Sequence, residues 1–340
     1  MTNMYIAIYP LFLLILFGCN TTHHTSDQSI SKDNKYDSEF PSESVSDELD
    51  YISRGVKKLD ILAFYATYYF PQDSSVSLDV INDSVLDIYS EYMTITHESV
   101  SGTAFVIYDY DNILGLLTCA HVIDFKDTVF SYYGDKNNQL QTLSIKIKQQ
   151  NHVSGLPSGE PIEIAAVNRE KDIALLMKKT VPNDQIIHTI NNPRGSISDL
   201  QWGSIVYIMG YPLGNLMVTR AIVSITEKMK SGIFVTDALY NHGISGSPVF
   251  GMRDGATNFE LIGMASSSAA QASNIIVPES DIKIDNNIKA PYTGKLFVDN
   301  NKLISYGVTY SVSIDEISTF ITTNEKALIS NGFIINNFFN

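Results

Sequence analysis

Three short segments of the chain carry residue types that together can activate a nucleophile. In chain order they are Thr-Cys-Ala-His at 118–121, Asp-Ile-Ala-Leu-Leu at 172–176 and Gly-Ile-Ser-Gly-Ser-Pro at 243–248. A serine hydroxyl is a weak nucleophile until a histidine takes its proton, and that histidine needs a carboxylate to fix its tautomer and stabilise its cation. The three segments therefore predict a hydroxyl nucleophile that is activated by an imidazole and a carboxylate.

Each candidate has a local context that suits this chemistry. His121 follows an apolar run, so a strand can present the imidazole at its end. Asp172 stands where the charged residues 169–171 give way to an apolar run. A carboxylate that is partly buried there needs a partner, and His121 is the expected one. Asp124 and Asp127 are alternative carboxylates, but both lie within six residues of the histidine in the sequence.

The glycines around Ser245 permit a tight turn. In such a turn the amides of Gly243 and Ser245 can point to one place and form an oxyanion hole, where each donor contributes about 3–4 kcal/mol to transition-state stabilisation. Ser247 adds a second hydroxyl, but its register in the motif excludes it as the nucleophile. Cys119 is expected to be a small buried side chain rather than a nucleophile.

The local motifs and the order His, Asp, Ser resemble the trypsin-like serine proteases, most closely the Deg-type (high-temperature-requirement) branch. The resemblance covers roughly residues 95–322 and includes Ser-Gly-Thr-Ala-Phe-Val-Ile at 101–107. It implies an all-β fold of two six-stranded barrels with the site between them. It also implies that His121 is the general base and acid, Asp172 the orienting carboxylate and Ser245 the nucleophile, with no metal or organic cofactor.

Other positions near the serine follow from the same resemblance. Ile244 stands where the family commonly has Asn or Asp, so activation by pairing with a newly freed N-terminus is not expected. Leu239 falls near the floor of the primary specificity pocket, and an apolar floor favours apolar or small side chains. The strand that contains Ser266 and Ser267 is expected to bind substrate by pairing with its extended backbone.

From residue 95 onward, short runs of β-branched and aromatic residues alternate with turn signals, which favours an all-β protein over alternating strands and helices. Strands are expected at 102–108, 114–118, 129–133, 142–148, 163–167, 173–177, 204–209, 219–226, 233–236 and 261–267. Apolar residues at three- and four-residue spacing predict two helices. They are an N-terminal helix with Leu49, Ile52, Val56, Leu59 and Ala63, and a C-terminal helix with Ile314, Ile317, Phe320 and Ile321.

Residues 4–18 form an apolar run with the length of a signal-peptide core, too short to span a bilayer comfortably. The run ends in Leu-Phe-Gly-Cys at 16–19, which resembles the bacterial lipoprotein box. By that resemblance residues 1–18 are removed and Cys19 is lipidated, which would hold the protein on a membrane surface outside the cytoplasm. The alternatives are an uncleaved anchor and a plain signal peptide.

The remaining chain is expected to divide into four parts. Residues 19–48 are polar and acidic and predict a disordered tether. Residues 49–94 form a helical and aromatic extension, residues 95–330 the protease domain and residues 331–340 a C-terminal tail. Many Deg-type proteases carry a PDZ domain, but none is expected after the C-terminal helix.

Composition limits the other functions. The net charge of −14 argues against nucleic acid as a partner, because a binding face would need clustered Lys and Arg. The expected partners are protein or peptide substrates and the membrane. A catalytically weak relative that uses the fold as a surface binding module is the alternative function. An α/β-hydrolase esterase is excluded because its serine would precede the other two residues in the chain.

Overall fold

The protein is described here by a computed structural model. The structure describes residues 33–339 except 40, 42, 75, 83–85, 87, 134–138, 157–160, 182–186, 226–230, 279–293 and 295. Residues 1–18, Cys19 and the first part of the expected tether lie outside the described residues. Within the described part of the chain, no helix has the length and apolar character needed to cross a membrane.

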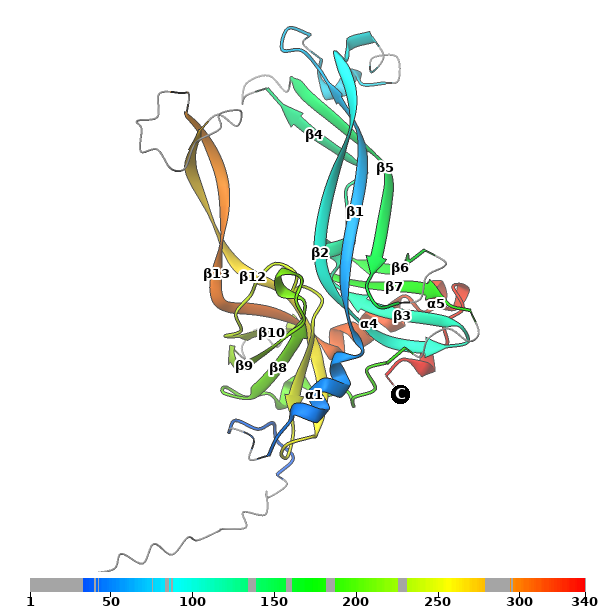
Figure 1. Cartoon of the computed structure of the whole chain (residues 1–340), viewed down its shortest axis with the longest axis vertical. Coiled ribbons are helices and arrows are strands. Elements are labelled where there is room, and N and C mark those ends of the chain that lie inside the picture. Colours follow the sequence, from blue (N-terminus) through cyan, green and yellow to red (C-terminus); the bar gives the residue numbers. More distant parts are fainter. Residues whose placement is uncertain are drawn as a thin grey trace, which may run out of the picture. The chain divides into compact units, whose positions relative to one another are not determined.

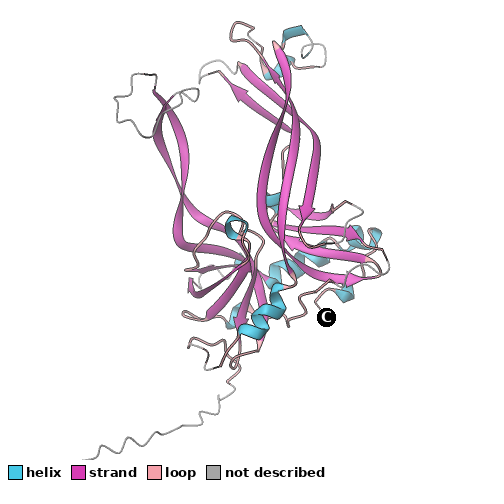
Figure 2. Ribbon diagram, in the orientation of Figure 1, coloured by secondary structure: helices cyan, strands magenta, loops and turns pink. Residues whose placement is uncertain are grey.

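Most of the described chain is β-structure, with a few short helices (Figures 1 and 2). The helices are α1 (Ser46–Ser53), α3 (Ala120–Ile123), α4 (Ile314–Thr323) and α5 (Glu325–Ser330). The strands are β1 (Val56–Tyr69), β2 (Tyr92–Tyr110), β3 (Ile113–Thr118), β4 (Thr128–Tyr132), β5 (Leu140–Val153), β6 (Glu163–Asn168), β7 (Ile173–Lys179), β8 (Ile205–Gly210), β9 (Met217–Ile225), β10 (Ile233–Thr236), β11 (Pro248–Met252), β12 (Phe259–Pro278) and β13 (Leu296–Ser313).

These strands form two sheets. The first has seven strands in the order β4-β5-β1-β2-β3-β7-β6, and the second is a closed barrel in the order β10-β13-β12-β11-β8-β9. All neighbouring pairs are antiparallel, as expected for strands joined by short turns. The expected all-β fold with two barrel-like sheets is therefore confirmed, although the first sheet has seven strands instead of six.

The N-terminal helix is shorter than expected, because β1 replaces its second half. Side chains in β1 alternate between buried and partly exposed, which is the period of a strand with one face on the core. Leu59 and Ala63 are four residues apart and fit either period. Ile61 lies between them and Tyr65 follows at the next inward position; both are 1% exposed, and together they fit only the strand. The predicted helix is wrong beyond α1.

The tether expected over 19–48 is also shorter than predicted. Tyr36 is 6% exposed and belongs to the core of the second barrel. The amide of Asp37 donates to the Met252 carbonyl, and the Asp37 carbonyl accepts from the Ile205 amide, both at 2.8 Å. This short segment therefore packs along β8 and β11 and is not a disordered tether.

The described parts of residues 268–301 belong to two long strands, because β12 and β13 form an antiparallel hairpin that extends beyond the barrel (Figure 1). β11 pairs with β12 only as far as Met264. Ala265 is bonded to the preceding turn, since its amide donates to the Ser247 carbonyl and its carbonyl accepts from the Gly246 amide, both at 2.8 Å. Beyond Ala265, the edge of β12 that faces away from β13 has no partner among the described strands.

The predicted C-terminal helix is confirmed as α4. Ser313 caps it by accepting a hydrogen bond from the Glu316 amide at 3.2 Å. The residues that follow also pack on the protein, since Phe333 and Phe338 are 2% and 7% exposed and their rings contact that of Tyr108 of the first sheet. The C-terminal segment thus becomes part of the core of the first sheet.

Candidate active site

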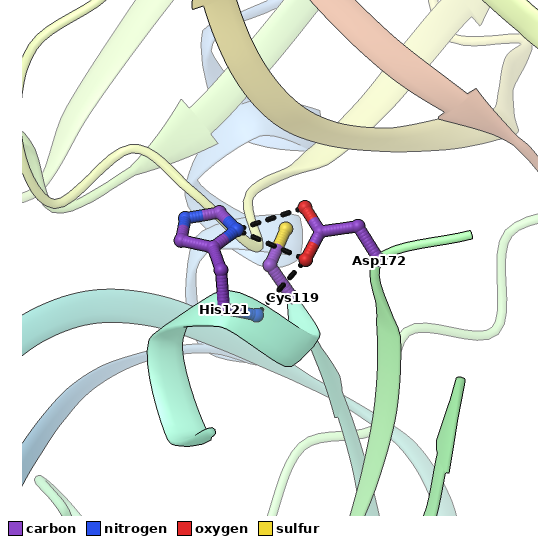
Figure 3. Close-up of side chains that lie close together, drawn as sticks. All are labelled: Cys119, His121 and Asp172. Atoms are coloured by element: carbon purple, nitrogen blue, oxygen red, sulfur yellow. Dashed lines mark hydrogen bonds and ion pairs between the residues drawn. The ribbon is translucent and has the colours of Figure 1, made fainter. Parts of the chain in front are cut away.

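His121 stands just beyond the end of β3, in the short helix α3. Its ring Nδ1 lies 2.8 Å from Oδ2 and 3.0 Å from Oδ1 of Asp172, and its backbone amide donates to Oδ1 at 2.9 Å. Figure 3 shows the imidazole and the carboxylate facing each other. These contacts fix the ring and favour the tautomer that carries its proton on Nδ1, which leaves Nε2 free to accept a proton.

Asp172 directly precedes β7 and has a left-handed backbone with φ +57°, a conformation that Asp adopts more readily than most residues. Its carboxylate also accepts a hydrogen bond from Ser266 Oγ at 2.5 Å. Burial alone would raise the pKa of this carboxyl. The hydrogen bond and charge of His121, together with the Ser266 hydroxyl, outweigh burial and lower the pKa below its ordinary value of 3.8. Asp172 is therefore ionised at neutral pH.

The two alternative carboxylates have other partners. Asp124 pairs with Arg169 through two hydrogen bonds of 2.6 and 2.7 Å. Asp127 lies 2.8 Å from the Lys146 ammonium and is 92% exposed. Neither forms the contact with the imidazole that Asp172 makes.

Ser245 lies in the turn before β11. Its Oγ is 3.0 Å from Nε2 of His121, and the residue is only 5% exposed. The histidine side chain is 47% exposed, so the base faces solvent while the nucleophile lies deeper. The structure thus brings the three predicted side chains into one continuous chain of hydrogen bonds from Asp172 to Ser245.

Two glycines allow this turn to form. Gly243 and Gly246 have φ of +100° and +88°, in the region that favours glycine. A Cβ on Gly243 would lie 2.3 Å from the Tyr211 carbonyl oxygen, and one on Gly246 would lie 2.0 Å from the Thr103 carbonyl oxygen. Among the backbone hydrogen bonds found in the described chain, the amides of Gly243 and Ser245 donate none. Both amides therefore remain available to stabilise an oxyanion.

Thr103 of β2 connects the first sheet to the serine turn, a role that was not anticipated from the sequence. Its Oγ1 donates to the Gly243 carbonyl at 2.7 Å and accepts from the Tyr211 amide at 2.9 Å. Its own amide donates to the Ser245 carbonyl at 2.8 Å. The only signal in the sequence is a small hydroxyl residue at the start of an apolar strand, which does not reveal a partner 140 residues away.

The expectation for Leu239 is not met, because its side chain is 62% exposed and does not line a buried floor. The neighbouring Tyr240 is 7% exposed instead. Its hydroxyl forms a short hydrogen bond with Ser245 Oγ and lies 3.2 Å from the Ser266 carbonyl oxygen. Burial raises the pKa of Tyr240 to about 12, so the phenol is neutral. Sequence reasoning missed this residue.

Ser266 and Ser267 lie on β12, and their side chains differ in position. Ser266 is 7% exposed, and its hydroxyl is committed to Asp172. Its carbonyl oxygen lies 3.1 Å from Ser245 Oγ. Ser267 is exposed. The Ser266 side chain therefore positions the carboxylate, and its carbonyl faces Ser245, whereas Ser267 pairs with Tyr310 of β13. An extended peptide could add as a strand to the edge of β12 that begins at Ser266.

Cys119 completes a group of possible metal ligands with His121 and Asp172, whose ligand atoms lie within 4.8 Å of one another (Figure 3). The thiol is fully buried and donates to the Ala265 carbonyl at 3.3 Å. Burial, followed by the charge of Asp172, raises the pKa of the thiol well above its ordinary value. Metals bind the thiolate. These residues therefore favour a neutral thiol beside a hydrogen-bonded His–Asp pair over a metal site.

Comparisons with known proteins bear on this site. Residues 102–264 match the family described as Trypsin-like peptidase domain. No curated protein matches the sequence. Among solved structures, the serine endoprotease from Yersinia pestis is similar, with 16% sequence identity and a TM-score of 0.41 over 86% of this chain and 69% of that chain. The matched family segment includes all three residues of the hydrogen-bonded chain.

Proposed function

We propose that this chain, which contains a trypsin-like peptidase domain and is a serine-type peptidase, is an endopeptidase. Its nucleophile is Ser245. His121 is the general base and acid, and Asp172 is the orienting carboxylate. Its substrates are proteins or peptides. We place it in the Deg-type branch, anchored outside the cytoplasm by a lipid on Cys19.

The observation that supports this function best is the chain of hydrogen bonds from Asp172 through His121 to Ser245. In each of these hydrogen bonds the donor and the acceptor are arranged as the reaction requires. The ionised carboxylate holds the proton on Nδ1, so Nε2 can accept the proton of the serine hydroxyl. The geometry that a general base requires, within about 3.2 Å of the proton donor, is present without any rearrangement.

The reaction follows from these positions. Ser245 Oγ attacks the peptide carbonyl carbon while its proton passes to Nε2 of His121, and the carboxylate of Asp172 stabilises the imidazolium. The carbonyl oxygen becomes an oxyanion that the amides of Gly243 and Ser245 stabilise, by about 3–4 kcal/mol for each donor. The imidazolium then protonates the leaving amine, and an acyl-enzyme ester remains. Water hydrolyses that ester through the same base.

The anchoring proposal rests on the sequence of the first nineteen residues alone. The apolar run at 4–18 has the length of a signal-peptide core, and Cys19 follows Leu-Phe-Gly. Two or more acyl chains at about 0.8 kcal/mol per buried methylene would bind stably to a bilayer.

A second function has one observation in its favour. Besides His121, the Ser245 hydroxyl has the Tyr240 hydroxyl and the Ser266 carbonyl within hydrogen-bond distance. If the serine hydroxyl donates its hydrogen bond to either of these oxygens instead of to Nε2 of His121, the nucleophile is weakly activated and the fold acts as a surface binding module.

Covalent labelling with a fluorophosphonate probe separates the two functions. The wild-type chain is expected to label at Ser245, and Ser245→Ala and His121→Ala are expected to lose the label. Ser247→Ala is the matched control, because it removes a hydroxyl two residues away and should label normally. Failure of the folded wild-type protein to label would favour the binding module.

Membrane anchoring is tested separately in bacterial cells that express the full chain. Wild-type protein is expected in the membrane fraction and to incorporate a labelled fatty acid, whereas Cys19→Ala should incorporate none. An unchanged label in Cys19→Ala would reject lipidation at this cysteine.

A further inference from the structure

Tyr240 occupies the immediate surroundings of the proposed nucleophile. Its hydroxyl is hydrogen-bonded to Ser245 Oγ and lies 3.2 Å from the carbonyl oxygen of Ser266. That carbonyl is itself 3.1 Å from Oγ. The phenol oxygen, Ser245 Oγ and the Ser266 carbonyl oxygen therefore form a cluster in which each oxygen lies within hydrogen-bond distance of the other two.

Core packing holds the ring of Tyr240 in place. It is 7% exposed and packs in the core of the second barrel with Ala238, Ile244 and Ala265. The segment is fixed as well, because Thr309 Oγ1 donates to the Ala238 carbonyl at 3.0 Å. Moving the ring away from the serine would expose a large aromatic side chain and empty part of this core, which is strongly unfavourable. The ring is thus a permanent part of the site.

The edge of β12 limits where a substrate can approach Oγ. Ala265 is already bonded to the serine turn, because its amide donates to the Ser247 carbonyl and its carbonyl accepts from the Gly246 amide, both at 2.8 Å. An extended peptide can therefore add to this edge only beyond Ala265, where it would pass the Ser266 carbonyl beside Ser245. In the acyl-enzyme the carbonyl carbon of the residue before the cut is bonded to Oγ. The Cα of that residue is then two bonds from Oγ and its Cβ three bonds away. Its side chain therefore needs the space beside Oγ where the phenol lies.

We propose that Tyr240 is a specificity-determining residue that closes the primary pocket and restricts the residue before the cut to Gly, Ala or Ser. The inference rests on the proposed endopeptidase function. A neutral phenol also offers no charge that could attract a Lys or Arg side chain. Leu239, which the sequence placed at the pocket floor, is exposed and takes no part.

The experiment measures kcat/KM of the full chain on peptides that differ only at the residue before the cut, with Gly, Ala, Leu or Phe there. Wild-type protein is expected to cleave after Ala about 100-fold faster than after Leu or Phe, the range of steric discrimination in enzyme pockets. Tyr240→Ala opens the space, so the Leu-to-Ala ratio of kcat/KM should rise at least tenfold. If Tyr240→Ala does not fold, Tyr240→Val keeps apolar packing and should shift the ratio in the same direction.

Tyr207→Val is the matched control, because Tyr207 is a buried ring of the same barrel, 5% exposed, that packs on Phe259. It should leave the ratio unchanged. A wild-type preference for Leu or Phe, or an unchanged ratio in both Tyr240 variants, would overturn the inference. Fluorophosphonate labelling of each variant keeps this outcome distinct from a failure of the proposed function, since a protein that labels has an active serine whatever its preference.

Discussion

At the scale of single residues, the two hydroxyls of the serine turn have opposite surroundings. Ser245 Oγ has three hydrogen-bonding neighbours. Ser247 is fully buried, and its Oγ has no partner among the described residues. A buried hydroxyl without a partner costs free energy, because it has lost its hydrogen bonds to water. The unpaired hydroxyl of Ser247 therefore lowers the free energy of unfolding, whereas the hydroxyl of Ser245 has hydrogen-bond partners.

Ser247→Ala should be neutral or stabilising as a result. Removing the unpaired hydroxyl relieves its desolvation, and we expect the free energy of unfolding to rise by up to about 1 kcal/mol. Denaturant unfolding of this variant beside the wild type measures the difference. A loss of 1 kcal/mol or more would mean that the hydroxyl has a partner, such as a buried water.

The carboxylate of Asp172 predicts a pH dependence of stability. Its folded-state pKa lies below the ordinary value of 3.8, despite burial, because of the hydrogen bonds from His121 and Ser266. Around and below that value the folded state therefore binds fewer protons than the unfolded state. The stability from the ionised form is complete above about pH 5 and is lost as the pH falls through the folded-state pKa.

Asp172→Asn tests this dependence. The difference in unfolding free energy between wild type and Asp172→Asn should shrink as the pH falls below about 4, where the carboxylate of the wild type becomes protonated. Chemical denaturation at each pH gives the difference. A difference that stays constant down to pH 3 would show that the carboxylate has no lowered pKa.

At the scale of elements, β2 is joined to the serine turn through Thr103. Its hydroxyl satisfies the Gly243 carbonyl and the Tyr211 amide together, and its amide binds the Ser245 carbonyl. The turn that presents two amides to an oxyanion is thus positioned by the first sheet as well as by its own barrel.

Thr103→Val should disturb this connection while keeping the side-chain shape. It leaves two backbone groups unpaired, so we expect a loss of about 2 kcal/mol of stability and a fall in kcat larger than any change in KM. Thr103→Ser keeps the hydroxyl and is the matched control; it should retain most of the stability and most of kcat. Equal kcat in the Val and Ser variants would argue that the hydroxyl does not position the turn.

Some of the strands could be predicted from the sequence and others could not. The strands β3, β6, β7 and β10 were predicted almost to the residue, because each is a short apolar run between turn signals. β1 was misread because Leu59 and Ala63 fit both the helical and the strand period. The β12–β13 hairpin was missed because its polar, small-residue sequence has no clear alternation. Side-chain contacts across the barrels, such as that of Tyr240 with the serine, depend on register and could not be predicted.

At the scale of the whole molecule, a short N-terminal segment is fastened to the second barrel. Tyr36 donates to Glu260 at 2.7 Å and accepts from the Ser196 amide at 2.9 Å, and its ring lies 4.2 Å from the guanidinium carbon of Arg253. Arg253 in turn pairs with Asp199 and Glu260. If Cys19 is lipidated, 16 residues (20–35) separate it from Tyr36. Even fully extended they span at most about 60 Å, which would limit the distance between this attachment and the membrane.

Tyr36 should therefore be an important contributor to the stability of the second barrel. Tyr36→Ala removes a buried ring and is expected to lower the free energy of unfolding by about 3–5 kcal/mol. Tyr36→Phe keeps the ring and its contact with Arg253 but loses the hydroxyl, with an expected loss of about 1–2 kcal/mol. Denaturant unfolding of both variants measures these losses. Equal and small losses in the two variants would show that the segment is only loosely attached, and the lipid would then allow the domain a much longer reach.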